Sequence, residues 1–571
     1  MTVTEPDPNA DPADEAAPTL RPTQWGVDIP GLEAADLRPI KWQMYLSLTG
    51  LALGALMGLL QAFERLDVNL YEEVGLETYY QGLTLHGVAL ALVFTFTFGN
   101  AFCSVTTMKG FNRPLASRAL SNLSMYLAWG GVVLAAWAIL ANKATVLFTF
   151  YAPLQATPAF YFGAVLLVVS TWLVLLNMLL TLRAWNRDNR GERVPLMAFV
   201  SIMTYLMWFI ASLGIAIEVL AFLIPWSLGL TTTVDPQFTR TLFWFSGHPI
   251  VYFWLLPVYV SWYMMLPAWV GGKLYSDGLT RMVFIAFLLL IPVGVHHQFT
   301  DPGIPFSSKT IQWLLTFGIF YPSVITAFTI FAALEMGARK RGGTGLIGWI
   351  RKLPWGNPVV SGQLLAGLAF MLGGVSGLIN ASYTINVVVH NTAFIPGHFH
   401  LTVGTAVALS IMAISYWFVP YLTGKELWGR KAAVAQGWMW MVGVLSFSRG
   451  LMANGVAGQP RRTEINSAAY AADHNWGLGN VMTGLGGLLM FLSACVFFTV
   501  ILKTIYNKQR VTEVQRVPHS EVMHGPRVKN VLLDRVGVWA AVAAVLIVIV
   551  YGELVLHYLP LNSVSEGIVL W

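Results

Sequence analysis

The chain has 571 residues, of which 56% are hydrophobic and 11% are charged. Soluble proteins carry about twice this share of charged residues, so the composition excludes an ordinary soluble enzyme and indicates a polytopic membrane protein. The net charge of +6 does not indicate a nucleic-acid partner, because the positions of the charges follow a membrane pattern.

Residues 1–39 differ in composition from the rest of the chain. They are rich in Pro, Ala and acidic residues, among them Glu5, Asp7 and Asp11. Such a segment cannot bury enough apolar surface to fold, so it is predicted to be a disordered cytoplasmic tail. It lacks the basic start and short apolar core of a secretory signal, so the first span is expected to serve as its own insertion signal.

Apolar runs of near-spanning length recur throughout residues 40–560 and predict about thirteen transmembrane helices. The runs begin near residues 41, 84, 119, 158, 195, 240, 280, 310, 359, 397, 433, 475 and 536. The predicted fold is therefore all-α, a polytopic helix bundle surrounded by membrane lipid. Residues 561–571 are predicted to form a short tail on the outer face.

The basic residues between the spans predict how the bundle lies in the membrane. Connections after odd-numbered spans carry only Arg65, Lys143, Arg240, Lys309, Arg461 and Arg462. Those after even-numbered spans carry Lys109, Arg113, Arg118, Arg183, Arg187, Arg190, Arg193, Lys273, Arg281, Arg339, Lys340, Arg341, Arg351, Lys352, Lys425, Arg430, Lys431 and a further run in 503–535. By the positive-inside rule, the N-terminus faces the cytoplasm and the C-terminus faces the outside.

Histidines near the outer ends of four spans are the candidate metal ligands. His86, at the start of the second span, is followed by Gly87, which would let a flat macrocycle approach the backbone. It is a candidate axial haem ligand. A helix-terminal histidine bonded to a backbone carbonyl is the alternative.

In the sixth span, His248 precedes Tyr252 by four residues. That spacing places both side chains on one helix face, one turn apart. The pair His296-His297 follows at the outer end of the seventh span. Together with His248 these residues offer three neutral imidazoles, which suit copper, zinc or iron and leave a coordination position open for a substrate.

His398 and His400 open the tenth span. Residues two apart on a helix point about 200° apart, so the two rings cannot share one metal but can serve two cofactors on opposite sides of the helix. If His400 faces His86 across a haem, that haem is six-coordinate and suited to electron transfer. A second haem on His398 would face the three-histidine site.

Polar residues near these spans suggest where haem propionates lie. Arg461 and Arg462 stand in an outer connection, and His390 and Asn386 precede the tenth span. Planar guanidinium groups bind carboxylates well, although an arginine pair in a loop is also common without such a role.

A proton route is predicted from the cytoplasmic side to Tyr252. Tyr252, Tyr259 and Tyr263 lie within about 20° of one face of the sixth span, and the eighth span adds Thr316, Ser323 and Thr326. Hydroxyl groups on two helices, with ordered water, can relay protons. Serine and threonine also serve as contacts between membrane helices, which is the alternative.

At these residues the chain resembles subunit I of the haem-copper oxidases, from about residue 40 to residue 560. The Gly-His-Pro-x-Val-Tyr, His-His-Gln and His-Phe-His motifs and the order of the spans carry the resemblance. It implies two haems, the low-spin one on His86 and His400 and the high-spin one on His398. It also implies one copper ion on His248, His296 and His297, and a covalent link between Tyr252 and His248.

Two positions depart from the pattern of many members of that family. Ile250 stands where a glutamate serves a separate proton channel, which resembles the B-type branch with its single proton route. Asn386 stands where the family usually has an aspartate. This puts in doubt an outer proton-loading role that needs a carboxylate at that position.

The resemblance implies a cytochrome c oxidase, the catalytic subunit of a terminal respiratory oxidase in a prokaryotic cell membrane. It would reduce dioxygen to water with four electrons, coupled to proton uptake and pumping, with Tyr252 and His248 as catalytic residues. Cys103 and Cys495 lie in separate spans, so a two-copper site is expected on a partner subunit II. Cytochrome c, or another small protein on the outer face, is the expected electron donor.

Two other functions are compatible with parts of the sequence. A nitric oxide reductase has a second metal in the same scaffold, but its chemistry does not need the tyrosine at Tyr252. A transporter with histidines along an ion path is a different class, which the opposed His398 and His400 disfavour. Haem absorbance bands and a copper assay separate the three.

Overall fold

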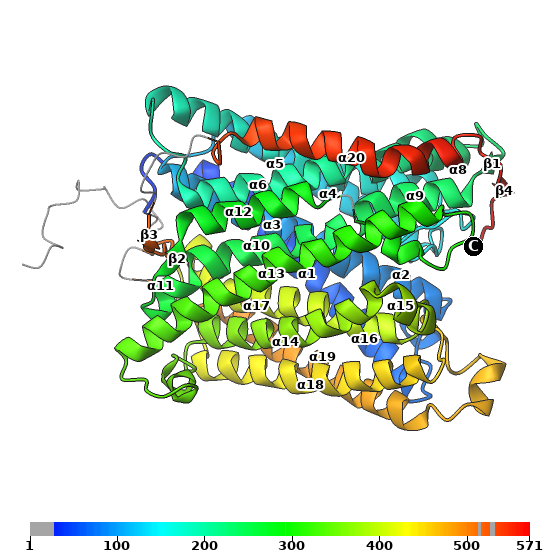
Figure 1. The fold of residues 1–571 in the computed structure, drawn as a ribbon. Helices are drawn as coiled ribbons and strands as arrows, with labels where there is room; N and C mark the ends of the chain where they lie inside the picture. The colour runs from blue at the N-terminus through cyan, green and yellow to red at the C-terminus, as the bar shows by residue number, and fades with distance from the viewer. Residues whose placement is uncertain (1–27, 292, 512–514, 526–531, 571) are drawn as a thin grey trace, which may run out of the picture.

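The computed structural model describes residues 28–570 except 292, 512–514 and 526–531. Long helices run side by side and make up most of the described structure (Figure 1). Most of the predicted acidic tail, residues 1–27, lies outside the described part of the chain. Helix α1 already begins at Ala34, within the stretch 1–39 that the sequence assigns to that tail.

The helices and strands follow in chain order. The first half contains α1 (Ala34–Arg65), η1 (Glu72–Val74), α2 (Tyr79–Gly87), η2 (Val88–Phe94), α3 (Thr95–Phe111), α4 (Arg118–Leu140), α5 (Pro158–Asp188), α6 (Leu196–Ala211), α7 (Leu213–Ile217), η3 (Glu218–Leu223), α8 (Ile224–Ser227), β1 (Thr233–Val234), α9 (Pro236–Gly247), α10 (Pro249–Met264), α11 (Leu266–Val270), β2 (Leu274–Ser276) and α12 (Asp277–Leu289). The second half contains η4 (Val295–Gln298), α13 (Phe306–Lys340), η5 (Gly348–Lys352), α14 (Pro358–Ala381), α15 (Tyr383–Val389), α16 (Phe394–Leu401), η6 (Thr402–Val407), α17 (Ala408–Thr423), α18 (Arg430–Val456), η7 (Ala469–Asp473), α19 (Gly477–Ile505), β3 (Val522–His524), α20 (Val536–Tyr558) and β4 (Ser565–Glu566).

Eleven helical stretches among the described residues are long and apolar enough to cross a membrane. They match eleven of the thirteen predicted spans, which confirms the all-α membrane bundle. The seventh predicted span appears as the 13-residue α12, after which the backbone leaves the helix. The eleventh appears as the 27-residue α18, which begins with Arg430-Lys431 and carries Arg449. The total of thirteen spans and their orientation therefore stay predictions.

Small strand pairs mark the two ends of the bundle (Figure 1). At one end β1 pairs antiparallel with β4, so the C-terminal segment lies beside the chain that leads into α9. At the other end β2 pairs in parallel with β3. The charge pattern predicts that the β1/β4 end faces outside and the β2/β3 end faces the cytoplasm.

Helices are irregular where the candidate histidines stand. A π-helical segment, η2, begins two residues after His86, and another, η6, begins two residues after His400. Helices α9 and α10 meet at His248, because Pro249 cannot donate the next helical hydrogen bond. Such irregular turns occur often at functional sites.

Candidate metal centres

Three histidines converge near the β1/β4 end of the bundle. The Nδ1 atom of His248 lies 2.9 Å from Nε2 of His296 and 3.1 Å from Nε2 of His297. These three residues form a group whose ligand atoms all lie within 4.8 Å of one another. One comes from the α9/α10 junction and two from η4, so tertiary packing of two segments creates the cluster.

The donor set and its surroundings fit a transition metal. Three nitrogen ligands with no carboxylate among them suit copper or zinc rather than a hard cation. Thr316 on α13 donates its only hydroxyl proton to the carbonyl of Gln312, so its oxygen accepts the Nδ1 proton of His296 at 3.0 Å. The Nε2 lone pair of His296 is thereby left free to bind an ion.

Tyr252 and Trp244 flank the cluster. The Tyr252 hydroxyl lies 2.8 Å from Nε2 of His248, the nitrogen that faces away from the other two histidines. The predicted pairing of Tyr252 with His248 on one helix face is thus present. Trp244, one turn before His248, stacks on the His297 ring with centroids 3.8 Å apart and planes 4° apart. Sequence reasoning missed Trp244, although its four-residue spacing from His248 was a usable signal.

His398 stands close to this cluster on a separate helix. Its Nδ1 lies 3.1 Å from the Gly373 carbonyl and 2.9 Å from the Ser376 hydroxyl. Because a carbonyl only accepts, Nδ1 carries the proton and Nε2 is free to ligate iron. A Cβ atom on Gly377 would lie 3.2 Å from the His398 ring, so the glycine makes room for the imidazole. His398 also interacts electrostatically with His248 and His296.

His86 and His400 face each other as a second pair. Their ring centroids are 6.3 Å apart and their planes differ by 22°. Because metal–imidazole nitrogen bonds are about 2 Å long, two imidazoles on opposite sides of one ion have centroids about 6 Å apart. Nδ1 of His86 donates to the Gly54 carbonyl at 2.8 Å, and Nδ1 of His400 donates to the Pro396 carbonyl at 2.7 Å. Both Nε2 atoms are therefore available to one haem iron.

The two arginines of the predicted propionate region lack carboxylate partners. Salt bridges near the β1/β4 end pair Arg65 with Glu64 and Arg240 with Asp301, whereas neither Arg461 nor Arg462 forms one among the described residues. Burial, together with the positive charge of Arg461, lowers the pKa of Arg462 to about 10. Half-buried guanidinium groups without anions fit a ligand that brings carboxylates.

His390 and Asn386 lie together beside these arginines. Nδ1 of His390 donates to the Asn386 side-chain carbonyl at 3.0 Å, and the Asn386 amide donates to the Asn380 carbonyl at 2.7 Å. Within the described structure, Nε2 of His390 is buried without a hydrogen-bond partner. Burial, with the positive charges of Arg461 and Arg240, lowers the pKa of His390 to about 4. His390 is thus neutral near pH 7 and offers an open nitrogen.

The predicted hydroxyl relay is partly continuous. The Tyr263 hydroxyl donates to Thr326 at 2.8 Å. The Tyr259 hydroxyl faces Ser323 and Thr326 but makes no hydrogen bond of ordinary geometry with the described residues. Thr316 bonds to His296 rather than to a tyrosine. The structure therefore brings both helices of the relay together and leaves gaps that need water.

Residues 38–489 match the family model described as cytochrome c and quinol oxidase polypeptide I. The chain belongs to this family. It is 43% identical over 541 residues to cytochrome c oxidase subunit 1 of Thermus thermophilus, covering 92% of this chain and 96% of that relative. It is 26% identical over 400 residues to quinol oxidase subunit 1 of Sulfolobus acidocaldarius, covering 67% and 72% of the two chains.

A solved structure gives the same assignment to the oxidase subunit I family. A cryo-EM structure of a heme-copper terminal oxidase dimer matches with a TM-score of 0.86 and 35% identity over 92% of this chain and 93% of that chain. The predicted terminal oxidase function in a multi-pass membrane protein is confirmed. Membership implies haem and copper as cofactors, and a subunit II and dioxygen as partners.

Proposed function

We propose that this subunit reduces dioxygen to water between a copper ion on His248, His296 and His297 and a high-spin haem on His398. A low-spin haem on His86 and His400 would pass electrons to that site. The observation that carries the proposal is the convergence of three imidazole nitrogens, with Tyr252 on the far nitrogen of His248. When bound, the iron and copper supply electrons and hold both oxygen atoms.

The protein residues contribute proton transfer and positioning. The Tyr252 hydroxyl, 2.8 Å from Nε2 of His248, would deliver a proton and an electron for breaking the oxygen–oxygen bond. Tyr259, Tyr263, Ser323 and Thr326 would bring protons from the β2/β3 end to Tyr252. Uptake from that side, with electrons arriving from the other, would charge the membrane during turnover and couple it to pumping.

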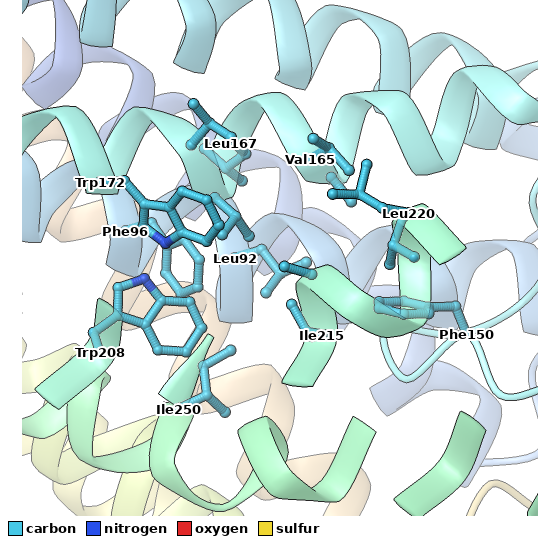
Figure 2. A pocket seen from close by; sticks show the side chains of 15 residues that line it. Leu92, Phe96, Phe150, Val165, Leu167, Trp172, Trp208, Ile215, Leu220 and Ile250 are labelled. Carbon is cyan, nitrogen blue, oxygen red and sulfur yellow. The ribbon is translucent and has the colours of Figure 1, made fainter. Parts of the chain in front are cut away.

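An apolar pocket beside the site offers a path for dioxygen. Figure 2 shows it between helices α5, α6 and α10, lined by side chains that include Val165, Trp172 and Leu220. Ile250, which lies between His248 and Tyr252 in the sequence, also lines it. An uncharged molecule enters such a pocket without the desolvation cost that excludes ions. Ile250 at this position also supports the B-type branch, with a single proton route.

Electrons would come from outside this subunit. Cys103 is buried in α3, Cys495 is exposed on α19, and both are free. They cannot form a two-copper site, so we propose that subunit II carries it. Cytochrome c or another small protein at the outer face would be the donor, as the name of the Thermus relative suggests.

The test is a reduced-minus-oxidised optical spectrum of the purified oxidase, with and without carbon monoxide, beside iron and copper analysis. The proposal expects two haems, of which carbon monoxide shifts one, and copper bound in this subunit. A second non-haem iron in place of copper would indicate the nitric oxide chemistry instead. A protein without haem bands would contradict both.

A further inference from the structure

Helix α20 lies outside the region that matches the family model, residues 38–489. It runs along the outside of the bundle (Figure 1), and only five of its 23 residues are buried. One stripe is buried, formed by Val550, Tyr551, Leu554 and Tyr558. It packs against Phe238 and Leu242 of α9 and against Val295 and Ile304 beside the copper-ligand segment. A peripheral helix therefore reaches both segments that carry the clustered histidines.

Tyr551 contacts both of these segments. Its ring packs edge-on against Phe245, three residues before His248, with centroids 4.9 Å apart. Its hydroxyl lies against Gly294, where a Cβ atom would be 2.8 Å from it. The same hydroxyl faces the Gln312 side chain. Tyr551 thus contacts the chain just before His248 and just before His296.

Gln312 holds the other side of the same segment. Its side-chain oxygen accepts hydrogen bonds from the backbone N–H groups of Gly294 at 3.0 Å and Val295 at 3.3 Å. The Gln312 side chain is fully buried. Within the described chain neither its amide nitrogen nor the Tyr551 hydroxyl has a hydrogen-bond partner of ordinary geometry. The two groups that remain unpaired face each other.

The segment needs external anchors because of its backbone. Helix α12 ends at Leu289 and η4 begins only at Val295, so the backbone amides of Gly294 and Val295 have no helical acceptors. A buried amide without a partner costs about 1–3 kcal/mol, and Gln312 supplies the missing acceptor. On the next turn of α13, Thr316 binds the His296 ring itself.

We propose that Gln312 and Tyr551 are positioning residues for the copper ion. They fix segment 294–296 so that Nε2 of His296 stays near Nδ1 of His248, and Tyr551 makes α20 part of the metal centre's support. The inference rests on the proposed copper site. It extends that site to a helix outside the part of the chain shared with the family model.

The experiment uses the purified oxidase complex with Gln312→Met and Tyr551→Phe variants. Tyr558→Phe is the matched control, because it removes a hydroxyl from the same stripe of α20 two turns away. Copper retention is measured against a competing chelator. The infrared C–O stretch is recorded for carbon monoxide transferred from haem to copper by a light flash, and thermal unfolding is followed in parallel.

Gln312→Met should lose copper about tenfold more readily, as expected for the loss of an outer-shell partner. Tyr551→Phe should shift or broaden the C–O stretch with a smaller change in retention, and Tyr558→Phe should match the unmodified protein. Unchanged copper retention and an unchanged stretch in both variants would overturn the inference, even if thermal stability fell. If Gln312→Met does not accumulate, Tyr551→Phe, which lacks one oxygen atom, decides the question by itself. An unmodified protein without copper would instead overturn the proposed function, and this inference with it.

Discussion

His86, His398 and His400 each donate the Nδ1 proton to a backbone carbonyl. In the described structure, the ring nitrogens of His248, His296 and His297 instead contact one another and other side chains. His296 bonds to Thr316, and His248 bonds to Tyr252. A carbonyl in a helix is fixed by the fold, whereas a side-chain partner is lost with a single substitution. The proposed haem ligands are therefore each held by a backbone carbonyl, with the Ser376 hydroxyl as a second partner of His398, whereas the proposed copper ligands are held by particular side chains.

The largest expected effects come from the ligands themselves. His296→Asn should lose copper and keep both haems, whereas His400→Asn should lose the six-coordinate haem spectrum and keep copper. Both should abolish oxygen consumption, because each variant breaks the electron path at a different metal. Metal analysis and optical spectra check this, with the exposed His474→Asn as the control. Loss of copper in His400→Asn would show that the proposed haem site on His86 and His400 and the proposed copper site depend on each other.

Breaking the hydroxyl relay should slow turnover without removing any metal. Tyr263→Phe removes the donor to Thr326, and loss of a positioned proton donor typically costs about 10²–10⁴-fold in rate. Tyr205→Phe is the control, because Tyr205 is a buried tyrosine that bonds to Asn100 on a different pair of helices. Oxygen consumption with unchanged haem spectra is the measurement. Equal slowing in both variants would contradict a single route through Tyr263.

Gly294→Ala should weaken the copper site while leaving the haems intact. An added Cβ would lie 2.0 Å from the Trp244 carbonyl, so the segment that carries His296 must move. Displacing ligand supports typically costs about 10- to 100-fold in metal affinity. A chelator titration gives the copper affinity, and the haem spectra serve as the internal control. Copper affinity equal to that of the unmodified protein would show that the segment tolerates the shift.

The smallest effect is expected in the haem region. Gly377→Ala brings a Cβ to 3.2 Å from the His398 ring, whereas Gly367→Ala on the same helix meets no heavy atom within 4 Å. Overpacking of this kind costs about 1–3 kcal/mol, so Gly377→Ala should lower the thermal unfolding temperature by a few degrees. The His398 carbonyl bond should hold the ligand in place. A lost carbon monoxide response would show that the haem site is as fragile as the copper site.

Helical periodicity was enough to predict the local geometry of the histidines. His248 and Tyr252 are four positions apart, and the structure brings their side chains into contact. His398 and His400 are two positions apart, and the structure directs them to Gly373 on α14 and to His86 on α2. These relations depend only on the rotation of about 100° per residue, which is the same in every α-helix. Their roles as ligands remain proposals.

The sequence by itself determined the membrane class, the all-α fold and the candidate ligands, because apolar run length and histidine spacing are local properties. Tertiary structure alone decided which partners orient the ligands. Trp244 stacks on His297, Gln312 binds the amides of Gly294 and Val295, and Tyr551 approaches Gly294 from a helix more than 250 positions later in the chain. Local spacing can place Trp244 on the helix face of His248, but it does not encode the contacts of these residues with distant segments. They form only when helices that are distant in sequence pack against each other. The non-helical segment between those helices then needs hydrogen-bond partners for its backbone amides.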